Sequence, residues 1–211
     1  MNGLDPTAVI GGRLPLINAN GRAGKSEFMV CESCEFVDTF LKLSPDMAVL
    51  LNIDNDHLDY FKTMDNLVAS FARFLKMSKV AVINGDDPLC LKAAEGFDGE
   101  LITFGIGSDN DYTATDIERA SLGFKFKVNF KGKYLFDLCL SVPGRHNVMN
   151  ALSVGAACRY YGVDDEGIKK GIEAFGGAGR RFEKLGEFNG FTLVDDYAHH
   201  PTEISATLNA A

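Results

Sequence analysis

The chain has 211 residues, of which 46% are hydrophobic and 10% are aromatic, and its formal net charge is -8. This length and apolar content suit one packed α/β domain with part of another, and they argue against a disordered chain. The negative charge argues against binding to nucleic acid or to an anionic membrane surface, because both require a basic protein surface. No apolar run is long enough to span a bilayer, so no membrane insertion is expected.

The chain contains five cysteines, an odd number at irregular spacing. A disulfide framework is not expected in a chain of this size, and reduced thiols of a cytoplasmic protein are the simpler interpretation. Cys31 and Cys34 have the spacing of a redox motif, but no second pair completes a zinc site, so we interpret this spacing as coincidence. The first residues show no basic segment followed by an apolar one, so no signal peptide is predicted.

In the first half of the chain, short apolar runs alternate with helical patterns. Residues 28–31 are predicted to form a short buried strand, and residues 47–51 and 80–83 are predicted to form fully buried strands. Residues 65–77, between the last two, carry apolar side chains at helical spacing. Strand, helix and strand in this order indicate a parallel sheet with crossover helices.

The pattern changes in the next part of the chain. Residues 112–140 alternate between apolar and polar side chains, and residues 131–133 offer a turn, so we predict an antiparallel hairpin in a small attached sheet. An alanine-rich amphipathic helix is predicted over residues 147–161, with Gly162 placed to end it. A second helix is predicted over residues 163–175.

The last part of the chain follows a glycine-rich linker at residues 176–179. Two short strands are predicted at residues 184–188 and 191–194, and a helix is predicted to begin near Pro201. We expect the chain to be truncated, because it ends inside this helix. Together these elements predict an α/β fold with a mostly parallel central sheet flanked by helices and a small antiparallel sheet.

One segment resembles a phosphate-binding loop without meeting its requirements. Residues 21–26 read Gly-Arg-Ala-Gly-Lys-Ser, with two residues between the glycines. The phosphate-binding loop needs four residues there, so that successive backbone N–H groups surround the phosphates. No buried strand leads into the segment, so we predict a polar loop.

A candidate metal site follows the first two predicted strands. Glu32 stands where the first of them ends, and residues 52–59, which follow the next, contain three carboxylates and one imidazole. Because the carboxyl ends of parallel strands meet at one edge of a sheet, we expect these groups to lie together and to bind a hard cation such as Mg²⁺. The alternative is a helix-capping loop with a packed histidine.

Two further groups of polar residues are candidates for nucleotide binding. Asn147 and Asn150 lie on one face of the first turn of a predicted helix, where carboxamides can read the edge of a purine; N-capping would explain one asparagine but not both. Arg180 and Arg181 follow the glycine linker and could bind phosphate, the alternative being a surface ion pair with Glu183. Two acids, a phenol and two imidazoles then gather in residues 195–200, at the end of a predicted strand.

The order of these segments resembles that of the Mur ligases, which build the peptide of bacterial cell-wall precursors. The resemblance is carried by Glu32 with Cys34-Glu35, and then by residues 56–59, 144–150, 180–183 and 195–201. Each segment alone is a weak signal, but five in order are specific, and they cover essentially the whole chain. The resemblance implies a central ATPase domain lacking its phosphate loop over residues 1–177, followed by the start of a Rossmann-like C-terminal domain over residues 178–211.

The resemblance also implies a reaction. Mur ligases use ATP to convert a carboxylate into an acyl phosphate, which the amine of an incoming amino acid attacks. Residues 180–183 and 195–201 are most similar to the branch of the family that adds L-alanine to UDP-N-acetylmuramate, with ATP and Mg²⁺ as cofactors. A related ligase that recycles whole murein peptides shares a similar second motif, although Phe182 favours the alanine-adding branch. A remnant without catalytic activity is the third possibility.

The roles that the resemblance implies are assigned residue by residue. The Mg²⁺ ligands are Glu32 and His57. The adenine-reading pair is Asn147 and Asn150, with His146 beside them. Arg181 faces the ATP phosphates, with Arg180 as a second candidate. The remaining contacts are Asp196 and Tyr197 to the ribose side of the nucleotide, and His199 towards the amino-acid pocket.

Overall fold

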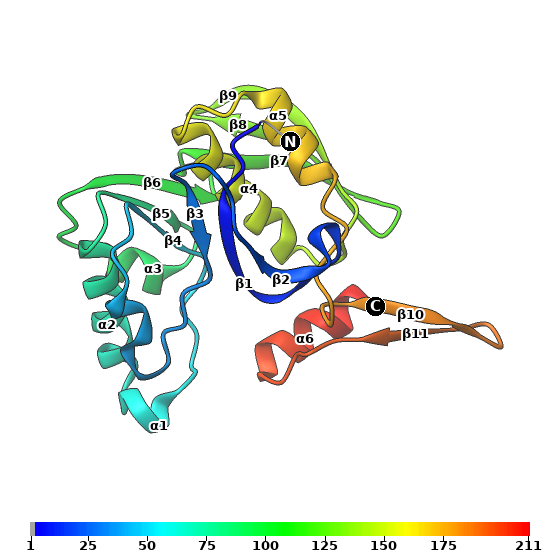
Figure 1. Ribbon diagram of the computed structural model, residues 1–211, viewed down its shortest axis with the longest axis horizontal. Coiled ribbons are helices and arrows are strands. Elements are labelled where there is room, and N and C mark those ends of the chain that lie inside the picture. The colour runs from blue at the N-terminus through cyan, green and yellow to red at the C-terminus, as the bar shows by residue number, and fades with distance from the viewer. Residues whose placement is uncertain (1–2) are drawn as a thin grey trace.

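The computed structural model describes residues 3–211, and its largest element is a six-stranded mixed sheet (Figure 1). The strands lie in sequence order: β4 (Met47–Leu50), β5 (Val80–Asn84), β6 (Glu100–Gly105), β7 (Tyr112–Ala120), β8 (Gly123–Phe130) and β9 (Lys133–Leu140). Neighbouring strands are parallel from β4 to β7 and antiparallel from β7 to β9. The predicted α/β fold with a mostly parallel sheet is therefore confirmed.

The predicted antiparallel segment is part of the main sheet. Phe104 of β6 pairs with Tyr112 of β7, which joins the parallel and antiparallel halves. The turn expected at residues 131–133 is present, because Lys131 and Gly132 connect β8 to β9 with positive φ angles. A second reversal at Ser121 divides the segment into three strands, where the sequence pattern predicted a simple hairpin.

Helices cover both faces of this sheet (Figure 1). One face packs against α2 (Met64–Lys76) and α3 (Pro88–Ala93), and the other against α4 (His146–Tyr160) and α5 (Asp165–Glu173). The first four residues of β5, Val80 to Ile83, are all apolar because both faces of the strand are covered. Val82 belongs to the core beneath α4 and α5, whereas Ala81 and Ile83 belong to the core beneath α2 and α3. A strand covered on both faces needs apolar side chains at successive positions.

Side-chain caps set the starts of three of these helices. Thr63 accepts a hydrogen bond from the Asn66 backbone N–H at the start of α2, and Asp87 and Asp164 cap α3 and α5 in the same way. Such caps bind N–H groups that have no partner within the helix. Gly162, with a φ of +80°, follows the end of α4 as expected, because glycine reaches this conformation without steric cost.

The first three strands form a separate sheet, and only its strand near residues 28–31 was predicted from the sequence. β1 (Thr7–Leu14) lies between β2 (Ala19–Arg22) and β3 (Met29–Cys31), and the short helix η1 (Pro15–Ile17) connects the first two. The strand before Glu32 was predicted to be buried, and this was wrong, since Met29 and Val30 are 60% and 62% exposed. It was also wrong to place that strand on the edge shared with residues 52–59, because β3 pairs with β1 and not with β4.

The loop at residues 21–26 is tied to the N-terminal segment of the protein. The backbone N–H groups of Lys25 and Ser26 both donate to the backbone oxygen of Asp5, at 3.1 and 3.3 Å. The guanidinium of Arg22 pairs with the Asp5 carboxylate. The backbone donors that a phosphate loop directs at its ligand are thus used within the protein, as expected of a polar loop.

The C-terminal segment projects from the rest of the molecule (Figure 1). Residues 176–179 form the connection, and they lead to the antiparallel pair β10 (Glu183–Phe188) and β11 (Phe191–Asp195) and then to α6 (Pro201–Ala210). Both strands and the helix were predicted. Between residues 3 and 211, no helix combines the length and apolar composition needed to cross a membrane.

Candidate functional site

The loop that follows β4 is held at the carboxyl edge of the sheet by the next strand. The side-chain amide of Asn84 donates to the Leu51 backbone oxygen at 3.0 Å. The Ile53 backbone N–H donates to the Asp87 carboxylate at 3.1 Å. These two contacts fix the start of the loop that carries Asp56 and His57, which leads into the short helix α1 (Leu58–Phe61).

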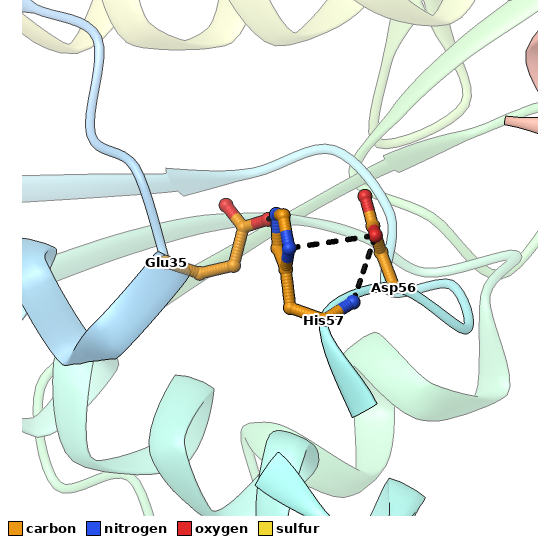
Figure 2. Close-up of side chains that lie close together, drawn as sticks. All are labelled: Glu35, Asp56 and His57. Atoms are coloured by element: carbon orange, nitrogen blue, oxygen red, sulfur yellow. Dashed lines mark hydrogen bonds and ion pairs between the residues drawn. The ribbon is translucent and has the colours of Figure 1, made fainter. Parts of the chain in front are cut away.

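Two carboxylates and an imidazole meet in this loop (Figure 2). One ligand atom from each of Glu35, Asp56 and His57 lies within 4.8 Å of the others. Nε2 of His57 is 3.4 Å from Oε1 of Glu35, and Nδ1 is 3.6 Å from Oδ1 of Asp56. The His57 ring also packs against Phe36, at 4.7 Å between centroids. Hard carboxylate oxygens with an imidazole form a donor set that fits a divalent cation.

Glu32, the metal ligand assigned from the sequence, lies outside this cluster. Its carboxylate accepts a hydrogen bond from the Gly11 backbone N–H at 2.7 Å. Glu35 takes its place beside His57, because the chain turns after β3 into the 3-10 helix η2 (Phe36–Lys42), which it enters at Glu35. The signal was available, since Glu35 belongs to the segment that carries the family resemblance, but sequence alone did not rank it above Glu32.

The polar residues at the start of α4 form a connected group. The Asn147 amide donates to the Pro143 backbone oxygen at 2.6 Å and lies 3.2 Å from Nε2 of His146. The Asn150 amide donates to Oδ1 of Asn147 at 3.3 Å. The two asparagines therefore share one face of the first helical turn, as the spacing predicted.

Both asparagines line a cavity of about 530 Å³. Its other lining side chains are mostly apolar and come from α4, α5 and the N-terminal segment, among them Val154, Ile168 and Leu16. A largely apolar pocket with a few polar groups at one side is the usual form of a small-molecule site. Its size and its carboxamides can accommodate a flat heteroaromatic ring.

The arginines after the linker gather around Tyr197. The guanidinium carbon of Arg180 lies 4.6 Å from the centre of the Tyr197 ring, and that of Arg181 lies 5.8 Å from it. Arg180 also pairs with Asp195 at 3.6 Å. Arg181 pairs with Glu203 at 3.8 Å and not with Glu183, whose carboxylate accepts a hydrogen bond from the Arg180 backbone N–H.

Arg181 and Asp196 also lie near the start of α4. Desolvation lowers the pKa of His146 from its ordinary value of 6.5, the Asp196 carboxylate opposes this effect, and the Arg181 guanidinium adds to it. The Asp196 carboxylate accepts hydrogen bonds from the backbone N–H groups of Phe182 and Ala198, at 2.9 and 2.7 Å. The structure thus places two charged side chains of the C-terminal segment within electrostatic range of His146, the neighbour of Asn147.

His199 is largely open to solvent, with 68% of its side chain exposed. Its Nδ1 lies 3.1 Å from the Tyr197 backbone oxygen and 3.7 Å from the Glu203 carboxylate. The ring therefore remains accessible to a ligand on the same side as Tyr197, whose ring is 5.3 Å away.

Comparison with known proteins identifies the family. Residues 13–158 match the Mur ligase middle domain, and residues 180–211 match the Mur ligase, glutamate ligase domain. The chain is 45% identical over 213 residues to the UDP-N-acetylmuramate–L-alanine ligase of Caldanaerobacter subterraneus subsp. tengcongensis, and the match covers 99% of the chain and 46% of that relative. The chain thus spans about half the length of such curated relatives.

Solved structures agree with this assignment. The UDP-N-acetylmuramate-alanine ligase of Thermotoga maritima superposes with a TM-score of 0.85 at 29% identity, covering 98% of this chain and 47% of that one. The MurF ligase of Thermotoga maritima in complex with ADP gives a TM-score of 0.78 at 21% identity, covering 99% of this chain and 51% of that one, a likeness in fold alone. The chain belongs to the Mur ligase family.

Proposed function

We propose that this chain is the catalytic middle of an ATP-dependent ligase that joins L-alanine to UDP-N-acetylmuramate, a step of peptidoglycan precursor synthesis in the cytoplasm. The 45% identity to an enzyme of that name supports the substrate pair. The five free thiols fit a reducing compartment. We place the boundary between the ATPase domain and the C-terminal domain at residues 177 and 178, inside the connection before β10.

A divalent cation, Mg²⁺ in our proposal, fits the cluster of Glu35, Asp56 and His57. The two carboxylates supply negative charge and hard oxygens, and the cluster lies at the carboxyl edge of the sheet, where ligands of α/β proteins bind. When bound, the ion would neutralise phosphate charge during phosphoryl transfer. Glu32 remains a prediction as a further ligand of the ion.

The nucleotide is proposed to lie between the start of α4 and the C-terminal segment. Asn147 and Asn150 would read the adenine edge, with His146 beside them, and Asp196 and Tyr197 would contact the ribose side. Arg181, with Arg180 next to it, would face the phosphates. A planar guanidinium can donate two hydrogen bonds to one phosphate, and it offsets the negative charge that accumulates as the γ-phosphoryl group moves to the acceptor carboxylate.

The remaining chemistry is amide formation. The amine of L-alanine attacks the acyl phosphate of UDP-N-acetylmuramate, the C–N bond forms, and inorganic phosphate leaves. The accessible ring of His199, beside Tyr197, is proposed to lie towards the amino-acid pocket. The electrostatic effect of Arg181 and Asp196 on His146 supports the proposal, because it relates the candidate phosphate contact to the residue beside the candidate adenine pair.

A chimaera tests this function. The 211 residues replace the matched region of the Caldanaerobacter ligase, which covers 46% of that enzyme. We expect ADP formation that depends on UDP-N-acetylmuramate, L-alanine and Mg²⁺ together. The isolated chain is the control and should form no product, since its sequence holds no complete phosphate-binding loop.

The outcome separates an enzyme from a remnant. A folded chimaera that forms no ADP with both substrates present would refute the ligase proposal and favour a remnant without catalytic activity. Folding is checked by thermal unfolding of the chimaera beside the unaltered relative.

A further inference from the structure

The start of α6 docks onto the loop that carries the candidate metal cluster. The Thr202 hydroxyl donates to Oδ2 of Asp54 at 2.7 Å. Nε2 of His200 lies 2.9 Å from the Asn55 backbone oxygen. These contacts join residues that are 148 and 145 positions apart in the sequence, so they depend entirely on the placement of the C-terminal segment.

The hydrogen bonds of His200 define the state of its ring. Nδ1 accepts from the Thr202 backbone N–H at 3.3 Å as part of a capping box with Glu203, so the proton resides on Nε2, which donates to Asn55. Only 20% of the side chain is exposed. The same ring therefore caps α6 and holds the middle of the loop.

The start and the middle of the loop have different anchors. Asn84 and Asp87 hold its start at Leu51 and Ile53, whereas the contacts from α6 hold Asp54 and Asn55. The next residues are the cluster members Asp56 and His57. His57 adopts a left-handed conformation with a φ of 54°, which is costly for a residue other than glycine and needs support from its surroundings.

We propose that Thr202 and His200 are positioning residues that couple the docked position of the C-terminal segment to the geometry of the metal cluster. The proposal rests on the metal site described above. Docking orders the loop in the arrangement that brings Asp56 and His57 towards Glu35. Because coupling between two equilibria is reciprocal, metal binding at the cluster in turn favours the docked segment.

The test compares two substitutions at one position. Thr202→Val keeps the shape of the side chain but removes its hydroxyl, and Thr202→Ser keeps the hydroxyl. Thr192→Val, on the exposed surface of β11, controls for the loss of a hydroxyl elsewhere. Hydrogen exchange of residues 54–57 is measured on the metal-free chain, and Mn²⁺ affinity is measured by water-proton relaxation.

We expect Thr202→Val to accelerate exchange of residues 54–57 and to weaken Mn²⁺ binding about fivefold, a scale set by one hydrogen bond to a charged group at a partly exposed site. Thr202→Ser and Thr192→Val should resemble the unaltered chain. Unchanged exchange in the loop, or equal effects of valine and serine, would overturn the proposal. If Mn²⁺ binding depends on His57, an unchanged Mn²⁺ affinity of the Thr202→Val variant would also overturn the proposal.

The metal site itself is tested separately by His57→Ala. Mn²⁺ binding that does not depend on His57 would refute the metal site, and the exchange measurement alone would then decide whether Thr202 holds the loop. The failure of one proposal is thus distinguishable from the failure of the other.

Discussion

Oε1 of Glu35 lies 3.4 Å from Nε2 of His57, whereas the carboxylate of Glu32, three residues earlier, binds the backbone of Gly11. This relationship leads to a direct comparison of the two glutamates. Glu35→Gln should weaken Mn²⁺ binding by roughly tenfold or more, because it removes a charged ligand and not only an outer contact. Glu32→Gln should have a much smaller effect.

Mn²⁺ titration of the two variants and of His57→Ala measures this difference, with thermal unfolding as the control for folding. A greater loss of Mn²⁺ affinity in Glu32→Gln than in Glu35→Gln would show that Glu32, the residue first predicted from the sequence, is the metal ligand.

We expect Arg181 to contribute to turnover and to have little effect on the stability of the fold. Its guanidinium is partly exposed, and its ion pair with Glu203 spans 3.8 Å, so the pair contributes little to the free energy of unfolding. In the chimaera, Arg181→Ala should lower turnover roughly a hundredfold, the scale for removing one preorganised donor. Arg181→Lys should restore only part of it, because an ammonium group cannot form the planar two-point contact.

Turnover and melting temperature of these variants are compared with those of Glu183→Ala. Glu183 accepts a hydrogen bond from the Arg180 backbone, so its substitution should not reproduce the loss of turnover. Equal losses in Arg181→Ala and Glu183→Ala would contradict a role for Arg181 at the phosphates.

The titration of His146 reports how the C-terminal segment sits against α4. Desolvation lowers the pKa of His146 below 6.5, Asp196 raises it and Arg181 lowers it further. Removing the positive charge in Arg181→Ala should therefore raise this pKa, and removing the negative charge in Asp196→Asn should lower it. NMR titration of the imidazole in the isolated chain measures both shifts. An unchanged His146 pKa in both variants would show that the C-terminal segment does not lie near the start of α4 in solution.

The five thiols should differ sharply in reactivity. Cys90 is fully buried, and burial, with the nearby Asp87 carboxylate, raises the pKa of its thiol. Cys34 and Cys139 are exposed. Because the thiolate is the reactive form, iodoacetamide at neutral pH should modify the exposed pair and leave Cys90 unmodified until the protein unfolds. Mass spectrometry of the labelled peptides checks this, and rapid labelling of native Cys90 would contradict the packing around α3.

Phe40 should be a major determinant of stability. Its ring is 1% exposed and stacks on Phe74 at 4.7 Å, so Phe40→Ala should reduce the free energy of unfolding by about 3–5 kcal/mol. Phe188, which is 76% exposed on β10, offers the matched control, and Phe188→Ala should change stability little. Denaturant unfolding of the two variants measures the difference. Similar losses at both positions would argue against the described burial of Phe40.

Residue patterns alone predicted the elements whose burial is local and periodic. The apolar run at residues 80–83 predicted β5 because a strand covered on both faces needs apolar side chains throughout, and helix α2 followed from apolar side chains spaced for one face. By contrast, β1 and β2 contain glycines and have no fully buried residue, so no hydrophobic pattern marks them. The spacing of Asn147 and Asn150 was equally local, since both lie in one helical turn.

Which distant groups lie together depends on the three-dimensional packing of the chain. The choice between Glu32 and Glu35 depends on the direction in which the chain turns after β3, and that direction is set by the packing of η2, where Phe40 is buried. The contacts of Thr202 and His200 with Asp54 and Asn55 join positions that no sequence spacing relates. Local patterns indicate backbone preference and burial, whereas these long-range contacts result from the packing of whole elements against one another.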